Sequence, residues 1–141
     1  MAGHFFEDLQ IGQSVSMVRT VTEADVVAFA AVSGDDNPVH LDEAFAAGTP
    51  FKTRIAHGML SASFISALLG TRLPGPGAIY LSQTLQFKRP VRLGATVEAR
   101  VEITALEEAK GRVTLSCVCS VEGKPVLEGE AVVMAPKRGG G

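Results

Sequence analysis

The most constraining feature of this chain is one apolar segment, residues 57–69, which contains no charged side chain. At helical spacing its apolar residues cover nearly the whole circumference, so no polar face remains for solvent. The segment is far too short to span a bilayer, and Gly70 follows it as a stop signal. Such a helix belongs in the middle of a fold, and the rest of the chain has to supply the layer that covers it.

After Ala78 the hydrophobic period changes to two, which indicates β-strands. Four stripes alternate in this way, at residues 79–87, 97–105, 113–121 and 127–133. The connections at residues 107–111 and 122–124 are short enough for antiparallel hairpins. Each stripe is expected to form one strand with a single apolar face.

Upstream of the apolar segment, residues 13–21 predict a first strand. Thr22 with Asp25 three residues on is typical of a helix start, and Gly34 is placed to end that helix in a left-handed cap. Residues 42–46 predict a short second helix. An early strand, helices and then four antiparallel strands define an α+β domain. We expect the sheet to wrap the single buried helix.

The 141 residues are enough for one domain with its own core, expected at residues 1–136, with a disordered tail at 137–141. The net charge of −2 offers no attraction for nucleic acid or an anionic membrane. The first ten residues are polar and show no secretory signal. Cys117 and Cys119 share one face of a predicted strand, which favours buried thiols over metal ligands and suits a reducing cytoplasm.

Candidate chemistry is concentrated in residues 33–40, SGDDNPVH. Asp35 and His40 place a carboxylate and an imidazole in one predicted loop, where they can converge on a water and activate it at neutral pH. The alternative is that Asp35 only caps local N–H groups and that His40 is a half-buried loop residue. Asn37 either orients Asp35 or only makes a turn.

The start of the apolar helix provides a second candidate site. Backbone N–H groups at a helix N-terminus attract negative charge, and Gly58 lets a ligand approach them closely. They can stabilise the enolate-like oxygen that forms when a thioester is attacked at its β-carbon. The alternative is a plain loop-to-helix junction. His57 can cap the helix or hydrogen-bond locally and is assigned no catalytic role, and Ser66 can be simply a small core residue.

Residues 29–40, FAAVSGDDNPVH, together with Ala46 resemble the hydratase-2 signature of the MaoC-like (R)-specific enoyl-CoA hydratases. Shorter similarities follow in the same order at residues 56–60, 79–81, 87–91 and 129–131. The likeness is greatest to the short single-domain hydratases that feed polyhydroxyalkanoate synthesis. The resemblance implies a hot-dog fold, in which an antiparallel sheet wraps a central helix at about residues 57–70. It also implies a homodimer with each active site near the dimer interface.

The resemblance assigns roles by position: Asp35 and His40 as the catalytic pair, Gly58 as the oxyanion N–H, Asn37 and Ser66 as supporting residues, and Ser66 and Leu69 towards the acyl pocket. It implies no metal or redox cofactor, and coenzyme A serves as the handle of the substrate. The expected reaction is reversible syn hydration of trans-2-enoyl-CoA to (R)-3-hydroxyacyl-CoA. The alternatives are a 3-hydroxyacyl-[acyl-carrier-protein] dehydratase, a hot-dog acyl-CoA thioesterase, and an acyl-CoA-binding module without turnover.

Overall fold

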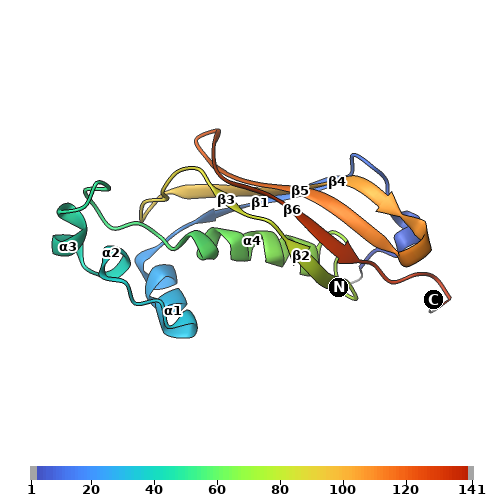
Figure 1. The fold of residues 1–141 in the computed structure, drawn as a ribbon, viewed down its shortest axis with the longest axis horizontal. Helices are drawn as coiled ribbons and strands as arrows, with labels where there is room; N and C mark the ends of the chain where they lie inside the picture. Colours follow the sequence, from blue (N-terminus) through green and yellow to red (C-terminus); the bar gives the residue numbers. More distant parts are fainter. Residues whose placement is uncertain (1–2, 140–141) are drawn as a thin grey trace.

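The computed structural model describes residues 3–139, which form one antiparallel sheet and a set of helices (Figure 1). The strands are β1 (Ser14–Thr20), β2 (Ile79–Gln83), β3 (Gln86–Phe87), β4 (Thr96–Glu107), β5 (Arg112–Val121) and β6 (Lys124–Met134). The helices are α1 (Glu23–Ser33), α2 (Pro38–Leu41), α3 (Glu43–Ala47) and α4 (Gly58–Thr71), with 3₁₀ turns at Phe6–Asp8 and Glu108–Lys110. The strand order is β1-β4-β5-β6-β2, and β3 also pairs with β6. The predicted α+β class and its two hairpins, β4–β5 and β5–β6, are confirmed.

Helix α4 lies along one face of the sheet, as Figure 1 shows, and its buried side chains form the centre of the core. Ile65, Leu68 and Leu69 are at most 2% exposed. They share one cluster with the inward-facing residues of β4, β5 and β6. Fully burying one such side chain contributes about 1.5–3 kcal/mol, so the interface between α4 and the sheet carries much of the stability. The predicted central helix is confirmed.

The prediction for this helix was wrong in two respects. The helix continues through Gly70 to Thr71, so the glycine does not end it. One side of α4 is also uncovered in the chain: Met59 is 53% exposed, and Ser63 and Ser66 are exposed too. The reason is that a single sheet covers only one side of a helix, which the pattern of apolar residues alone does not reveal.

The first predicted stripe, residues 79–87, forms two strands rather than one. The break falls at Thr84, whose N–H donates to a carbonyl of β6 at 2.9 Å. Gly129 on β6 permits this approach, because a Cβ there would lie 1.9 Å from the Thr84 carbonyl oxygen. The stripe does not face the core either, since Ile79 is 56% and Leu81 43% exposed.

The two cysteines lie two residues apart on β5 with no exposed surface, and both are free thiols. This confirms the prediction of two thiols in the core. Burial raises the pKa of Cys117, and it raises the pKa of Cys119 to about 12. The strand register shifts directly after Cys119, and Val121 is therefore only half-buried.

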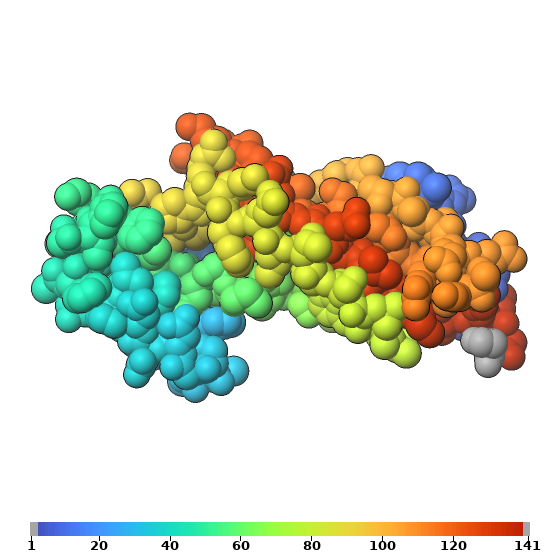
Figure 2. Space-filling view, in the orientation of Figure 1, coloured from blue at the N-terminus to red at the C-terminus, as the bar shows by residue number. Residues whose placement is uncertain are grey.

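Between β1 and α4 the chain leaves the sheet and forms a lobe of three helices, α1 to α3, which projects at one end (Figures 1 and 2). Helix α1 begins as predicted: Thr22 Oγ1 accepts the Asp25 N–H at 3.1 Å, and the Asp25 carboxylate accepts the Thr22 N–H at 3.0 Å. It ends at Gly34, whose φ of 80° is left-handed. Around His40, however, the expected loop contains the four-residue helix α2.

The C-terminal segment contacts the turns at the other end of the sheet. Lys137 Nζ donates to the carbonyl of Glu108, and Arg138 forms an ion pair with Asp8 at 2.6 Å. Residues 140–141 of the predicted disordered tail lie outside the described residues, and the domain boundary at residue 136 stays a prediction. Within residues 3–139, no helix has the length and apolar character needed to cross a membrane.

Candidate active site

A cavity of about 440 Å³ opens where the lobe meets the N-terminal end of α4. Asp35, His40 and Gly58 all line it. Much of the remaining lining is apolar and includes Phe51, Ile55, Phe87, Val91 and Leu127. An apolar cavity with a few convergent polar groups is the usual form of a small-molecule site. The fold thus brings three of the predicted residues together in one place.

His40 is 8% exposed and is held by a backbone carbonyl. Its Nδ1 lies 2.7 Å from the carbonyl oxygen of Ile55. A carbonyl can only accept a hydrogen bond, so Nδ1 carries the hydrogen and the neutral ring keeps its lone pair on Nε2. The bond also fixes the orientation of the ring. His40 is therefore prepared to take a proton at Nε2.

Asp35 follows the left-handed Gly34 and is held by its neighbours in sequence. Its N–H donates to the hydroxyl of Ser33 at 3.1 Å, and its carboxylate accepts the N–H of Asn37 at 3.4 Å. The Asn37 side chain in turn accepts the N–H of Val39 at 3.1 Å and so caps α2. Asn37 thus contacts the Asp35 carboxylate through its backbone and starts the helix that carries His40.

His57 neither caps α4 with its side chain nor bonds locally, as the sequence had suggested, but contacts both candidate residues. It is 2% exposed. Its Nε2–H donates to the backbone carbonyl of Asp35 at 2.9 Å, and its ring stacks on His40 with 3.8 Å between centroids. Phe29 packs against its ring with a centroid distance of 4.8 Å. His57 therefore links the Asp35 backbone to the His40 ring.

Gly58 is the first residue of the 14-residue helix α4, and the first N–H groups of a helix have no partner within it. A Cβ at Gly58 would lie 2.5 Å from Cε1 of Phe87, so no side chain fits there without displacing that ring. One turn along the helix, Ser61 also lines the cavity, is 2% exposed, and has a hydroxyl without a partner among the described residues. Sequence reasoning missed Ser61.

The two residues assigned towards an acyl pocket lie elsewhere. Leu69 is buried in the core. Ser66 is on the exposed side of α4 and borders a separate hollow with Tyr80 and Leu81. Neither is part of the lining of the cavity at Asp35. Their role towards an acyl chain therefore stays a prediction.

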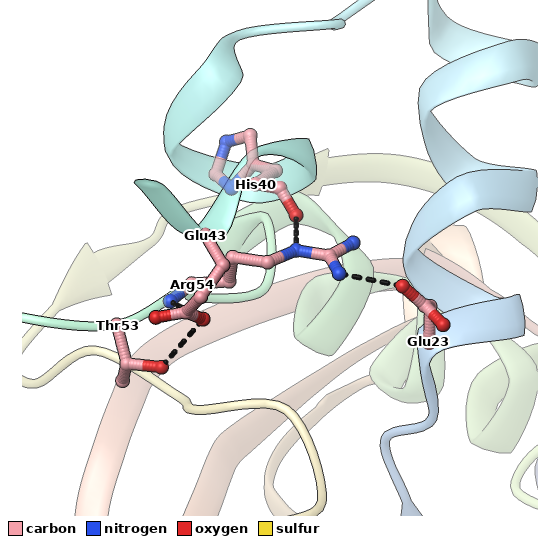
Figure 3. Close-up of polar contacts among 5 residues, drawn as sticks. All are labelled: Glu23, His40, Glu43, Thr53 and Arg54. Carbon is pink, nitrogen blue, oxygen red and sulfur yellow. Dashed lines mark hydrogen bonds and ion pairs between the residues drawn. The ribbon is translucent and has the colours of Figure 1, made fainter. Parts of the chain in front are cut away.

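Arg54 connects the helices of the lobe through contacts with His40 and Glu23, as Figure 3 shows. Its Nε donates to the backbone carbonyl of His40 at 2.8 Å, and its Nη1 lies 2.5 Å from the carboxylate of Glu23 on α1. The carboxylate of Glu43 accepts the Thr53 hydroxyl at 2.9 Å and the Arg54 N–H at 3.2 Å. These contacts join all three short helices to the segment before α4, and the sequence analysis did not find them.

Known proteins are similar to this chain in both sequence and fold. Residues 8–121 match the family described as MaoC like domain, so the chain belongs to the MaoC-like domain family. It is 59% identical over 136 residues to the (R)-specific enoyl-CoA hydratase of Rhodospirillum rubrum, covering 96% of this chain and 94% of that protein. It is 54% identical over 134 residues to the 3-hydroxybutyryl-CoA dehydratase of Methylorubrum extorquens, covering 95% of this chain and 85% of that protein.

A solved structure gives the same result. The (R)-hydratase from Aeromonas caviae involved in polyhydroxyalkanoate biosynthesis superposes with a TM-score of 0.90 at 50% identity, over 92% of this chain and 99% of that one. The predicted hot-dog fold and the resemblance to the MaoC-like hydratases are confirmed.

Proposed function

We propose that this protein is an (R)-specific enoyl-CoA hydratase, a hydro-lyase that reversibly adds water to trans-2-enoyl-CoA to give (R)-3-hydroxyacyl-CoA. One observation carries the proposal: a carboxylate oxygen of Asp35 and a ring nitrogen of His40 lie within 4.8 Å of each other at an apolar cavity. A gap of that size is spanned by one water molecule that accepts or donates on both sides. The activities named for the relatives support the same reaction and the same stereochemistry.

The reaction follows from the groups around the cavity. His40 takes a proton from water at Nε2, because Nδ1 is already bonded to Ile55, and the hydroxyl adds to C3 of the enoyl thioester. The enolate oxygen that develops accepts the N–H of Gly58 at the positive end of α4. The proton returns through Asp35 to C2, so one water supplies both added groups and His40 ends neutral.

The proposed chemistry needs no metal or redox cofactor, since water provides both the hydrogen and the hydroxyl, and coenzyme A is only the carrier of the acyl group. Asp35, His40 and His57 do offer atoms close enough to share a metal ion. One nitrogen of each imidazole donates to a backbone carbonyl, and the other keeps a lone pair that suits proton transfer as well as metal binding. We assign the two rings to proton transfer and support, because the hydration itself needs no metal.

The test is the loss of enoyl-thioester absorbance when the protein meets crotonyl-CoA, with the product coupled to an (R)-specific hydroxyacyl-CoA dehydrogenase. Asp35→Asn and His40→Ala should each lower kcat at least about 100-fold, the scale of a lost acid–base group. Asp36→Asn is the matched control, because it removes a neighbouring carboxylate that is not part of the cavity lining. Full activity in Asp35→Asn or His40→Ala would remove that residue from the mechanism.

Other outcomes identify the alternatives. Turnover of crotonyl-[acyl-carrier protein] but not of crotonyl-CoA or a longer enoyl-CoA would identify a dehydratase of carrier-protein thioesters. Release of free coenzyme A thiol would identify a thioesterase. Binding of acyl-CoA without turnover would identify a binding module.

We further propose that the chain works as a homodimer in which the β2 edges of two sheets meet. Within the described residues β2 is the last strand of its sheet, and its Ile79, Tyr80 and Leu81 are all more than 40% exposed. An exposed apolar edge strand is a ready site for strand pairing. The hollow beside it is bordered by Met59 and Ser66 of the uncovered side of α4. A partner strand would cover both features.

Light scattering during size-exclusion chromatography tests the dimer. Ile79→Glu should give a monomer, because it places a charge in the proposed interface. Val18→Glu is the control, since Val18 is 61% exposed on β1 at the opposite edge of the sheet. A wild-type monomer, or a dimer that survives Ile79→Glu, would disprove this arrangement.

The two free buried thiols support a reducing compartment such as the cytoplasm, where the (R)-product can enter polyhydroxyalkanoate synthesis or fatty-acid metabolism.

A further inference from the structure

Helix α2, which carries His40, is too short to hold its own position. It has four residues, and the Asp42 N–H closes its last turn by donating to the carbonyl of Pro38. Isolated helices of this length are not stable. The orientation of the His40 ring therefore depends on contacts from outside the helix.

Three of those contacts come from residues 54–55. The Ile55 N–H donates to the carbonyl of Val39 at 3.3 Å. The His40 Nδ1–H donates to the carbonyl of Ile55 at 2.7 Å, and Arg54 Nε donates to the carbonyl of His40 at 2.8 Å. The backbone and the ring of His40 are thus both held by one short segment.

Arg54 extends this support to α1. Its side chain is 13% exposed, and its guanidinium pairs with Glu23 in the first turn of α1 (Figure 3). Helix α1 leads through Gly34 directly into Asp35. A planar guanidinium carries donors on separate nitrogens in fixed directions, whereas an ammonium has all its donors on one nitrogen. Arg54 therefore connects the helix that precedes Asp35 with the helix that carries His40.

We propose that Arg54 is a positioning residue that sets the placement of His40 relative to Asp35. Arg54 is not part of the cavity lining, so it acts through the two elements that it joins and not on the substrate. The inference rests on the proposed hydratase function for its kinetic consequence, but the geometric role of Arg54 can be measured without turnover.

Arg54→Met should lower kcat for crotonyl-CoA at least about tenfold, because a misplacement of about 1 Å in a catalytic group costs up to 100-fold. KM should stay within about twofold, since no contact to the cavity is lost. Arg54→Lys should recover only part of kcat, because the single ammonium nitrogen cannot occupy both positions now held by Nε and Nη1. Glu23→Gln should have a smaller effect, and adding it to Arg54→Met should cost nothing more.

Arg100→Met is the matched control. Arg100 also forms an ion pair, with Glu102 at 2.9 Å, but lies on β4 and outside the cavity lining. The same substitution there should leave kcat unchanged. Circular dichroism and thermal melts establish that the compared variants are folded.

The second readout is the imidazole nitrogen signals of His40 in histidine-labelled protein, assigned with His40→Ala. Arg54→Met should shift these signals, and Arg100→Met should not. Unchanged His40 signals in folded Arg54→Met would overturn the inference even if kcat fell, and so would a shift without any loss of kcat. If the wild type does not hydrate enoyl-CoA, the proposed function fails, and the His40 signals alone decide the role of Arg54.

Discussion

Replacing Gly58 by alanine tests whether the end of α4 acts on the substrate. The added Cβ would lie 2.5 Å from Cε1 and 2.7 Å from Cδ1 of Phe87. Carbon atoms make favourable contact at about 3.5 Å, so the ring has to withdraw by roughly 1 Å. Phe87 is 55% exposed and can move outward. The cost to folding should therefore be about 1 kcal/mol, at the low end of the range for overpacking.

The cost to catalysis should be larger. The new methyl group meets the Phe87 ring, which lines the cavity together with Gly58, so we expect it to crowd the approach of a substrate oxygen to the Gly58 N–H. Losing one oxyanion donor lowers kcat by about 10²–10³. We therefore expect Gly58→Ala to hydrate crotonyl-CoA about 100-fold more slowly, equal to about 2.7 kcal/mol of transition-state stabilisation. The melting temperature should fall by only about 3 °C. The enoyl absorbance assay and a thermal melt measure the two effects on the same preparation.

A double variant separates the two causes of a slow enzyme. Phe87→Ala removes the ring that the new methyl group displaces, and it is measured alone and combined with Gly58→Ala. If the loss of the donor is responsible, the double variant stays about as slow as Gly58→Ala. Restored activity would instead assign the defect to the displaced ring. Turnover of Gly58→Ala within about threefold of the wild type would refute the role of the helix end.

Three further predictions concern the scaffold. Because burial raises the pKa of Cys119 to about 12 and also raises that of Cys117, neither thiol should react with a thiol reagent at pH 8 in the native protein, and both should react in guanidinium, as mass spectrometry can count. Gly129→Ala should lose about 3 kcal/mol in urea unfolding, the upper end for overpacking, because its Cβ meets a backbone carbonyl oxygen at 1.9 Å that cannot rotate away. The helix cap at Thr22 lowers the pKa of Asp25. The cap therefore stabilises the fold at pH values above the unfolded-state pKa of Asp25, and this stabilisation is lost as the pH falls through the folded-state pKa of Asp25. Asp25→Asn should be less stable than the wild type at pH 6 and equal to it near pH 2, as measured by urea unfolding across that range.

Most of the fold could be predicted because its elements are defined by local patterns. The alternation at residues 97–105 and 113–121 became β4 and β5, and the uncharged apolar run became α4. The stripe at residues 79–87 was wrongly predicted to form one strand, because its interruption depends on Gly129. This glycine lies far along the chain and leaves room for the backbone of Thr84. No pattern within the stripe itself reports that approach.

The site divides in the same way. Asp35, His40 and Gly58 could be predicted because each belongs to a short motif in which a few neighbouring residues indicate the chemistry. Arg54 and His57 were missed, since their contacts reach Glu23 and Asp35 across 31 and 22 residues. A signal did exist for His57: a histidine directly before an apolar helix sits at the end where that helix meets a ligand.

The lobe has a consequence for how such proteins diversify. Residues 22–57 leave the sheet after β1 and return at α4, and they contain Asp35, His40 and Arg54 in one uninterrupted piece. Much of the apolar wall of the cavity, by contrast, comes from the sheet side at Phe87, Val126 and Leu127. Exchange of that one segment between related genes would transfer the proposed proton-transfer groups together with Phe51 and Ile55 of the wall, and would leave the sheet side of the wall in place. Such an exchange would change the proposed catalytic groups while keeping the wall residues that the sheet supplies.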